Sequence, residues 1–133
     1  MAVKMPNYSV ELDLKQMQRS PLEILRGSAE DLRDQTRGLV EGAVFTLNAG
    51  GSSLFRHTFY LRVPSLNDYT DPLFYAWHDA NLYPVNVMLS GGKQGKDERE
   101  CRTVQEFEAE LERIFASVDT LKRLRALMVL AQK

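Results

Sequence analysis

The chain has 133 residues, of which 44% are hydrophobic and 26% charged, and its formal net charge is −1 at pH 7. These ordinary values predict one folded domain over residues 1–133, large enough to bury a core without disulfides or metal. The balanced charge argues against binding of nucleic acid through its phosphates, which usually requires a basic excess. The chain has one cysteine, which excludes an internal disulfide.

The sequence shows neither a signal peptide nor a membrane span. Residues 1–5 hold one lysine and no apolar run, and every apolar stretch is far shorter than the roughly 20 residues that cross a bilayer. A lone thiol also suits a reducing compartment. We therefore expect a cytoplasmic protein that has no contact with a membrane.

The N-terminal part of the chain changes from a strand pattern to a helical one. Residues 8–14 alternate apolar and polar side chains, which indicates either a half-buried strand or a loose terminal arm. Ser20, Pro21 and Glu23 then have the spacing of a capping box with proline in the first turn. Apolar residues follow at helical steps, so the pattern predicts a helix that ends near Gly38.

Strand patterns fill the middle of the chain, separated by turn-rich segments. Pro64 should end one strand, because proline cannot donate to a sheet ladder. Residues 67–72 predict a turn, and residues 91–102 a polar loop without secondary structure. The predicted strands are 40–48, 54–63, 73–78 and 83–89, with a hairpin loop at 49–53.

Alternation in the predicted strands separates two faces. One face of strand 54–63 is apolar apart from a histidine, and the other is polar and basic. The first set is Phe55, His57, Phe59, Leu61 and Val63, and the second is Arg56, Thr58, Tyr60 and Arg62. In strand 40–48, Ala43, Phe45 and Leu47 share a face.

The C-terminal region predicts one helix or two. Thr103 and Glu106 have the spacing of a second capping box, and residues 117–120 are where a break would fall. The segment 121–130 then holds more large apolar residues than one buried helix face normally needs. Either the domain covers this excess itself, or a second copy of the chain does. The residues are Leu121, Leu124, Leu127, Met128, Val129 and Leu130.

The order of these elements predicts an α+β fold. Helices at both ends of a run of hairpin-joined strands favour a mostly antiparallel sheet of four to five strands. The N-terminal helix and the one or two C-terminal helices should pack on one face. The other face would then be exposed, or covered by a partner.

Catalytic patterns are weak in this sequence. His57 is expected on the core-facing side of the sheet and dispensable for activity, and His78 and Asp79 should point to opposite faces. No histidine spacing indicates a metal site, and no motif calls for a cofactor. Cys101, in the predicted polar loop, is interpreted as an incidental exposed thiol.

We therefore favour a non-enzymatic protein–protein interaction or accessory module, either binding another protein or forming a homodimer. Its expected contact residues are Arg56, Tyr60, Arg62, Leu124, Leu127 and Met128. One alternative is a small-molecule-binding protein or enzyme with a pocket near His57 and His78. A second is a single-stranded nucleic-acid binder that uses the face of Arg56, Tyr60 and Arg62.

Overall fold

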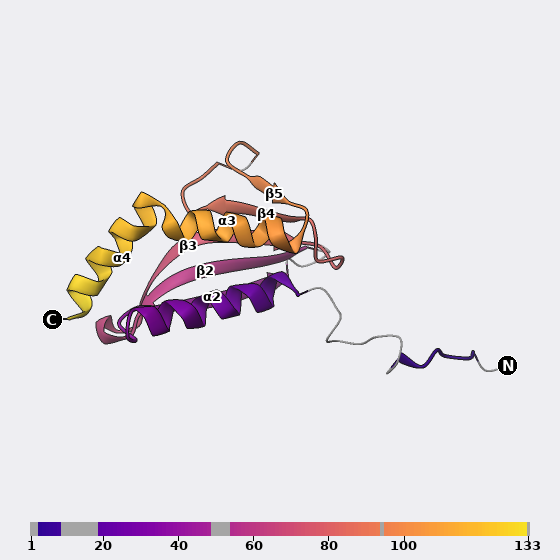
Figure 1. The fold of residues 1–133 in the computed structure, drawn as a ribbon, viewed down its shortest axis with the longest axis horizontal. Helices are drawn as coiled ribbons and strands as arrows, with labels where there is room; N and C mark the ends of the chain where they lie inside the picture. The colour runs from indigo at the N-terminus through magenta and orange to yellow at the C-terminus, as the bar shows by residue number, and fades with distance from the viewer. Residues whose placement is uncertain (1–2, 9–18, 49–53, 94, 133) are drawn as a thin grey trace.

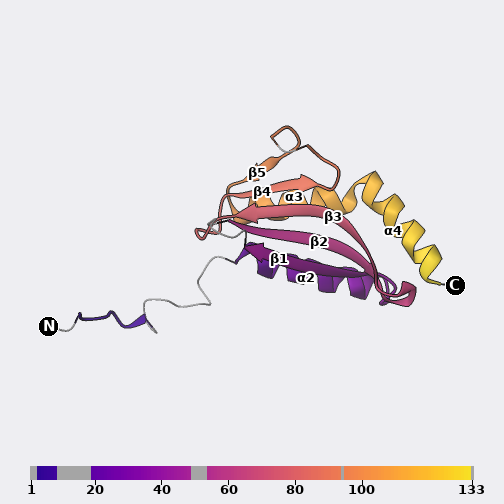
Figure 2. The same ribbon diagram turned by 180° about the vertical axis from the view of Figure 1, so that it is seen from behind.

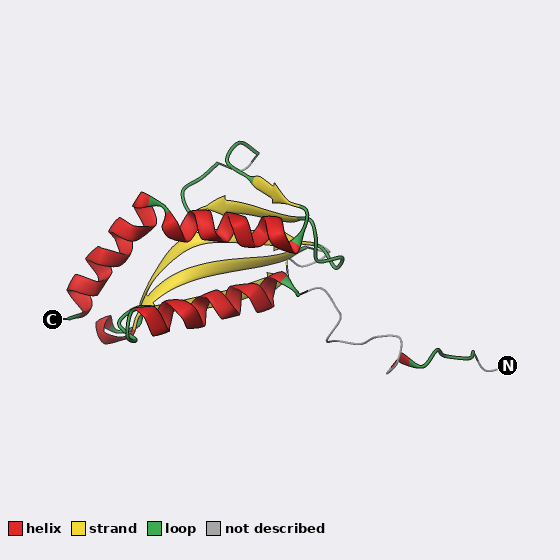
Figure 3. Cartoon of the chain, in the orientation of Figure 1, coloured by secondary structure: helices red, strands yellow, loops and turns green. Residues whose placement is uncertain are grey.

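The computed structural model describes residues 3–8, 19–48, 54–93 and 95–132. Figures 1 and 3 show one sheet with helices on one side and α4 running past its end. The elements are α2 (Pro21–Gln35), β1 (Glu41–Asn48), β2 (Phe55–Val63), the 3-10 turn η1 (Pro64–Leu66), β3 (Tyr69–His78), β4 (Val85–Leu89), β5 (Arg99–Cys101), α3 (Val104–Ala116) and α4 (Val118–Ala131). The predicted 49–53 loop, and the 8–14 segment beyond Tyr8, lie outside the described residues.

The sheet is an antiparallel meander in which neighbours along the chain are neighbours in space. Its order is β1-β2-β3-β4-β5, and every described pairing is antiparallel. The α+β class with helices at both ends is therefore confirmed.

Two segments predicted as irregular are strands. β3 begins at Tyr69, so the predicted turn at 67–72 is mostly strand, and the chain reverses earlier, at Asn67 and Asp68. Both of these residues have positive φ, near 55°. The predicted polar loop at 91–102 contains β5, whose three residues are too few to show a periodic pattern.

The core lies between the sheet and the helices. Phe59 and Phe74, paired across β2 and β3, are fully buried, and their rings stack with centroids 5.1 Å apart. Phe115 from α3 meets both rings edge-on. As predicted, His57, Phe59, Leu61 and Val63 of β2 point to this side and are buried.

Close approach of α2 to the sheet depends on Gly42 in β1. A β-carbon at this position would lie 2.6 Å from the Cα atom of Ala29 in α2 and 2.6 Å from the ring of Phe59. Real β-carbons essentially never come so close to backbone. The absent side chain therefore lets α2 pack directly on β1.

Capping side chains fix where the helices begin. The Ser20 hydroxyl accepts a hydrogen bond from the Glu23 amide at 3.1 Å, and Thr103 accepts from the Glu106 amide at 3.1 Å. In a capping box the Glu106 carboxylate would accept from the Thr103 amide, but here it accepts from the Arg102 amide. Both predicted helix starts are confirmed.

The C-terminal region is two helices, joined at Ser117. This residue has extended backbone, with φ −67° and ψ 151°, and it ends α3 and begins α4. Its hydroxyl donates to the Ile114 carbonyl at 2.8 Å and accepts from the Thr120 amide at 3.2 Å. α4 therefore leaves α3 at an angle (Figure 1).

A β-bulge interrupts β3 opposite Phe59 and Tyr60. These two residues pair with Phe74 and Pro72, which leaves Leu73 as the extra residue. The bulge turns Asp71 to the helix side, where its carboxylate forms an ion pair with Arg123 of α4 at 3.4 Å. Arg123 also donates to the Pro72 carbonyl at 3.2 Å. The bulge thus anchors α4 to the sheet.

Among the described residues, no helix is both long enough and apolar enough to cross a membrane.

Candidate protein interface

The face of the sheet opposite the helices, called the outer face below, is aromatic and uncovered. No helix or strand of the described chain lies over it (Figure 2). The pairing register places Thr58 between Phe45 and Tyr75, and Arg56 between Leu47 and Trp77. The outer face comprises Glu41, Ala43, Phe45, Leu47, Arg56, Thr58, Tyr60, Arg62, Thr70, Pro72, Tyr75, Trp77, Asn86, Met88 and Glu100.

Two large apolar side chains of β1 are exposed to solvent on the outer face. Phe45 is 57% exposed and Leu47 is 51% exposed. On the same face, Tyr60, Tyr75 and Trp77 of β2 and β3 are half-buried. This gathering of rings on one open surface is unlike a solvated sheet face, where polar side chains normally alternate outward.

The arginines of the outer face are held in place by their neighbours. The Arg56 guanidinium lies over the Tyr75 ring, 4.5 Å from its centroid. Arg62 forms an ion pair with Glu41 across the β1–β2 pair. The Glu41 carboxylate, with the hydrogen bond it accepts, raises the pKa of Arg62 further above its ordinary value. The predicted common face of Arg56, Tyr60 and Arg62 is confirmed. The positive charge of Arg62 is already compensated by Glu41.

The three predicted contact residues of α4 are not equivalent. Leu127 is only 7% exposed and packs in the core, so it is the inward-facing leucine. Leu124 and Met128 are half-buried at the edge of that core. Leu121, Val129 and Leu130 are each about half exposed, at 48%, 55% and 51%. The domain therefore covers only part of the apolar surface of α4.

The two histidines form a buried hydrogen-bonded chain. His57 and His78 are 2% and 5% exposed, and their Nε2 atoms lie 2.8 Å apart. His78 Nδ1 lies 2.7 Å from the Asp79 carbonyl, which can only accept, so Nδ1 carries the proton. When both rings are neutral, His78 Nε2 accepts from His57 Nε2, and His57 Nδ1 accepts from the Thr46 hydroxyl at 2.9 Å.

These hydrogen bonds and the burial of the ring make His57 a neutral structural residue. Burial is the main cause that lowers the pKa of His57 from 6.5 to about 4, and electrostatic interactions with the neighbouring His78 and Arg26 add to it. The bonds run between the two rings, a hydroxyl and a carbonyl, and no carboxylate takes part in them. The core-facing position predicted for His57 is confirmed.

Cys101 is buried, and its interpretation as an exposed thiol is wrong. It is 3% exposed, in β5 opposite Val85. Burial, with the charges of Glu110 and Glu106, raises the pKa of the thiol to about 11, so it is protonated at neutral pH. Among the described residues, no group of three or more His, Cys, Asp and Glu side chains could hold a metal ion.

Comparisons of the chain with protein-family models, with curated proteins and with solved structures find no match. The candidate interface therefore stands on its own geometry.

Most aromatic members of the outer face were missed by the sequence prediction, which named only its β2 residues. Phe45 and Leu47 were correctly placed on a common face of their strand. The alternation could not say which side the helices cover, because β1 and β3 carry apolar residues on both sides. The register of β3 against β2 brings Tyr75 and Trp77 to the same side.

Proposed function

We propose that the protein is a non-catalytic interaction module that binds another folded protein through the outer face of its sheet. The observation that carries the proposal is the exposure of Phe45 and Leu47 on the same face as half-buried Tyr60, Tyr75 and Trp77, a face that no described helix or strand covers. Soluble domains rarely leave such a contiguous apolar surface free unless something binds it.

The composition of this face supports a protein partner. Tyrosine, tryptophan, methionine and arginine are the residues enriched in the cores of protein interfaces. The Arg56 guanidinium already lies over the Tyr75 ring, so part of the conformational entropy that binding would cost is lost in the free protein. A nucleic-acid strand receives less support, because Glu41 offsets the charge of Arg62. An enzyme pocket at His57 and His78 receives less, because both rings are buried.

The test is photo-crosslinking in the producing cells. A photoreactive phenylalanine analogue at Phe45 should give one discrete adduct heavier than the 15.2 kDa chain, and Arg56→Glu should abolish it. The same analogue at exposed Lys93, in the loop before β5, is the matched control and should give none. Absence of an adduct at Phe45, or identical adducts at both positions, would contradict the proposal.

The identified partner then allows a direct measurement with the purified components. Trp77 is the one tryptophan of the chain and lies on the outer face. Binding at this face should reduce the quenching of Trp77 fluorescence by acrylamide, in proportion to the fraction of the protein in the complex. Unchanged quenching in a saturated complex would show that the partner sits elsewhere.

A further inference from the structure

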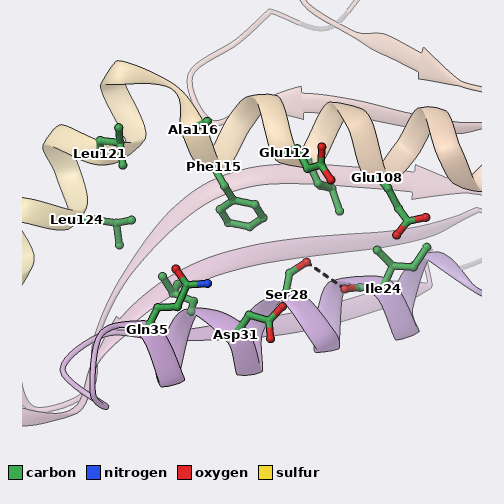
Figure 4. A pocket seen from close by; sticks show the side chains of 12 residues that line it. Ile24, Ser28, Asp31, Gln35, Glu108, Glu112, Phe115, Ala116, Leu121 and Leu124 are labelled. Atoms are coloured by element: carbon green, nitrogen blue, oxygen red, sulfur yellow. Dashed lines mark hydrogen bonds between the residues drawn. The ribbon is translucent and has the colours of Figure 1, made fainter.

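A second surface lies on the helix side of the molecule, in a groove of about 510 Å³ between α2 and α3 (Figure 4). Its floor is apolar and is formed by Ile24, Leu32, Leu111 and Phe115. The start of α4 closes one end with Leu121 and Leu124. The groove exists because the two helices lie apart on the sheet.

The rim of this groove is acidic. Asp31 on α2 faces Glu108 and Glu112 on α3 across the opening (Figure 4), and the residues that line it include no lysine or arginine. Glu108 is paired with Arg19 at 2.6 Å. The carboxylates of Asp31 and Glu112 make no hydrogen bond or ion pair with the rest of the described chain. An occupant should therefore be apolar on one side and carry positive charge.

The groove continues along α4. A shallower hollow of about 340 Å³ lies between the end of α2 and α4, and Leu121 and Leu124 border both hollows. Met128 and Val129 extend the apolar wall beyond them, and Arg125 also borders this second hollow. Together the two hollows offer a binding surface several helical turns long.

α4 itself has the chemistry that this groove requires. Val118, Leu121 and Val129 are 80%, 48% and 55% exposed, and at 100° per residue they lie on the side of α4 away from the buried Leu127. Lys122 and Arg125 lie among them and are exposed. The face is thus aliphatic and basic, whereas the part of the groove between α2 and α3 is aliphatic and acidic.

We infer that the chain forms a homodimer in which α4 of each copy lies in the acidic groove of the other. The contact is reciprocal, as a closed twofold dimer requires. Leu121 and Leu124 lie near the axis, because each borders the groove of its own copy and belongs to the helix that enters the other. Lys122 and Arg125 of one copy approach Asp31 and Glu112 of the other. The outer face of the sheet lies on the opposite side and stays free.

A charge exchange tests this arrangement. One variant carries Lys122→Glu and Arg125→Glu, and the other carries Asp31→Lys and Glu112→Lys. Each variant alone places like charges together, so its dimer dissociation constant should rise on the order of tenfold or more. An equimolar mixture of the two variants restores opposite charges at both contacts and should form a heterodimer of near wild-type affinity.

Sedimentation equilibrium on the full chain measures all these states, and circular dichroism checks that each variant is folded. Lys93→Glu is the matched charge reversal outside the groove and should leave the dimer unchanged, as should Phe45→Glu on the outer face. A wild type that is monomeric at millimolar concentration overturns the inference. It is also overturned if both variants still dimerise alone, if their mixture stays monomeric, or if Phe45→Glu dissociates the dimer. Each of these outcomes is independent of the crosslink at Phe45.

Discussion

The aromatic residues on the two faces of the sheet differ in burial and in role. On the helix side, Phe59 and Phe74 are fully buried and stacked on one another. On the outer face, Phe45 is mostly exposed, and Tyr75 lies beneath an arginine. The helix side therefore supplies the stability of the domain, and the outer face can change with little effect on the fold. Four predictions test this division, in decreasing order of expected effect.

The largest difference is expected between two phenylalanines. Phe59→Ala removes a ring from the centre of the core and should lower the free energy of unfolding by about 3–5 kcal/mol. Phe45→Ala is the matched change on the outer face and should alter it by less than about 0.5 kcal/mol. Urea denaturation followed by circular dichroism measures both. Comparable losses would mean that the outer face is part of the core.

The second prediction concerns pH and the histidine chain on the helix side. Because the pKa of His57 is lowered from 6.5 to about 4, the unfolded chain binds more protons between these values. Stability should be complete above about pH 6.5 and fall by up to about 3 kcal/mol as the pH drops to 4.

Carboxylates also contribute to acid destabilisation, so the control is His57→Gln. Glutamine offers a donating NH2 group and an accepting carbonyl oxygen, and it does not titrate. Subtracting its urea-denaturation profile from the wild-type profile isolates the contribution of His57. Parallel profiles between pH 4 and 6.5 would show that folding does not lower the pKa of His57.

The third prediction concerns the contact between α2 and the sheet. Gly42→Ala forces a β-carbon against the Ala29 backbone and should cost about 1–3 kcal/mol. Gly27 is the matched control, since a β-carbon there meets nothing within 4 Å. Gly27→Ala in the interior of α2 should stabilise the protein by roughly 0.5–1 kcal/mol. Thermal denaturation separates the two, and equal shifts of the same sign would refute the close approach.

The smallest expected effects are at the helix caps. Ser20→Ala and Thr103→Ala each remove one hydroxyl that accepts from a helix amide, and each should cost about 1 kcal/mol. Thr103→Ser keeps the acceptor and should stay near the wild type. If thermal denaturation finds both alanine variants unchanged, the caps contribute nothing to the helix layer.

Local patterns determined how much of the fold could be predicted. Helix starts at Ser20 and Thr103 were readable because capping depends on residues three positions apart. The faces of β2 were readable because alternation is strict. β5 could not be predicted, because three residues between charged neighbours show no periodic pattern. For the same reason Cys101 was predicted to lie in an exposed loop.

The candidate interface depends on long-range information that the sequence does not display. Tyr75 and Trp77 join Phe45 and Arg56 only through the pairing register of three strands. The α2–α3 groove depends on the spacing of two helices that are about 70 residues apart in the chain. Which leucine of α4 faces inward follows from the angle set at Ser117, and sequence periodicity alone left Leu124 and Leu127 equivalent.

The bulge at Leu73 has a consequence for insertions and deletions in the gene. Loss of the Leu73 codon would leave Pro72 and Phe74 adjacent, in unbroken pairing with Tyr60 and Phe59, and both would keep their sides of the sheet. The losses would be one buried leucine and the hydrogen bond that its carbonyl accepts from the Ser90 amide at 3.0 Å. Loss of the Tyr60 codon would instead exchange the two sides beyond it and expose Leu61. Reading-frame-preserving deletions should therefore be tolerated at Leu73 far more readily than in the neighbouring strand.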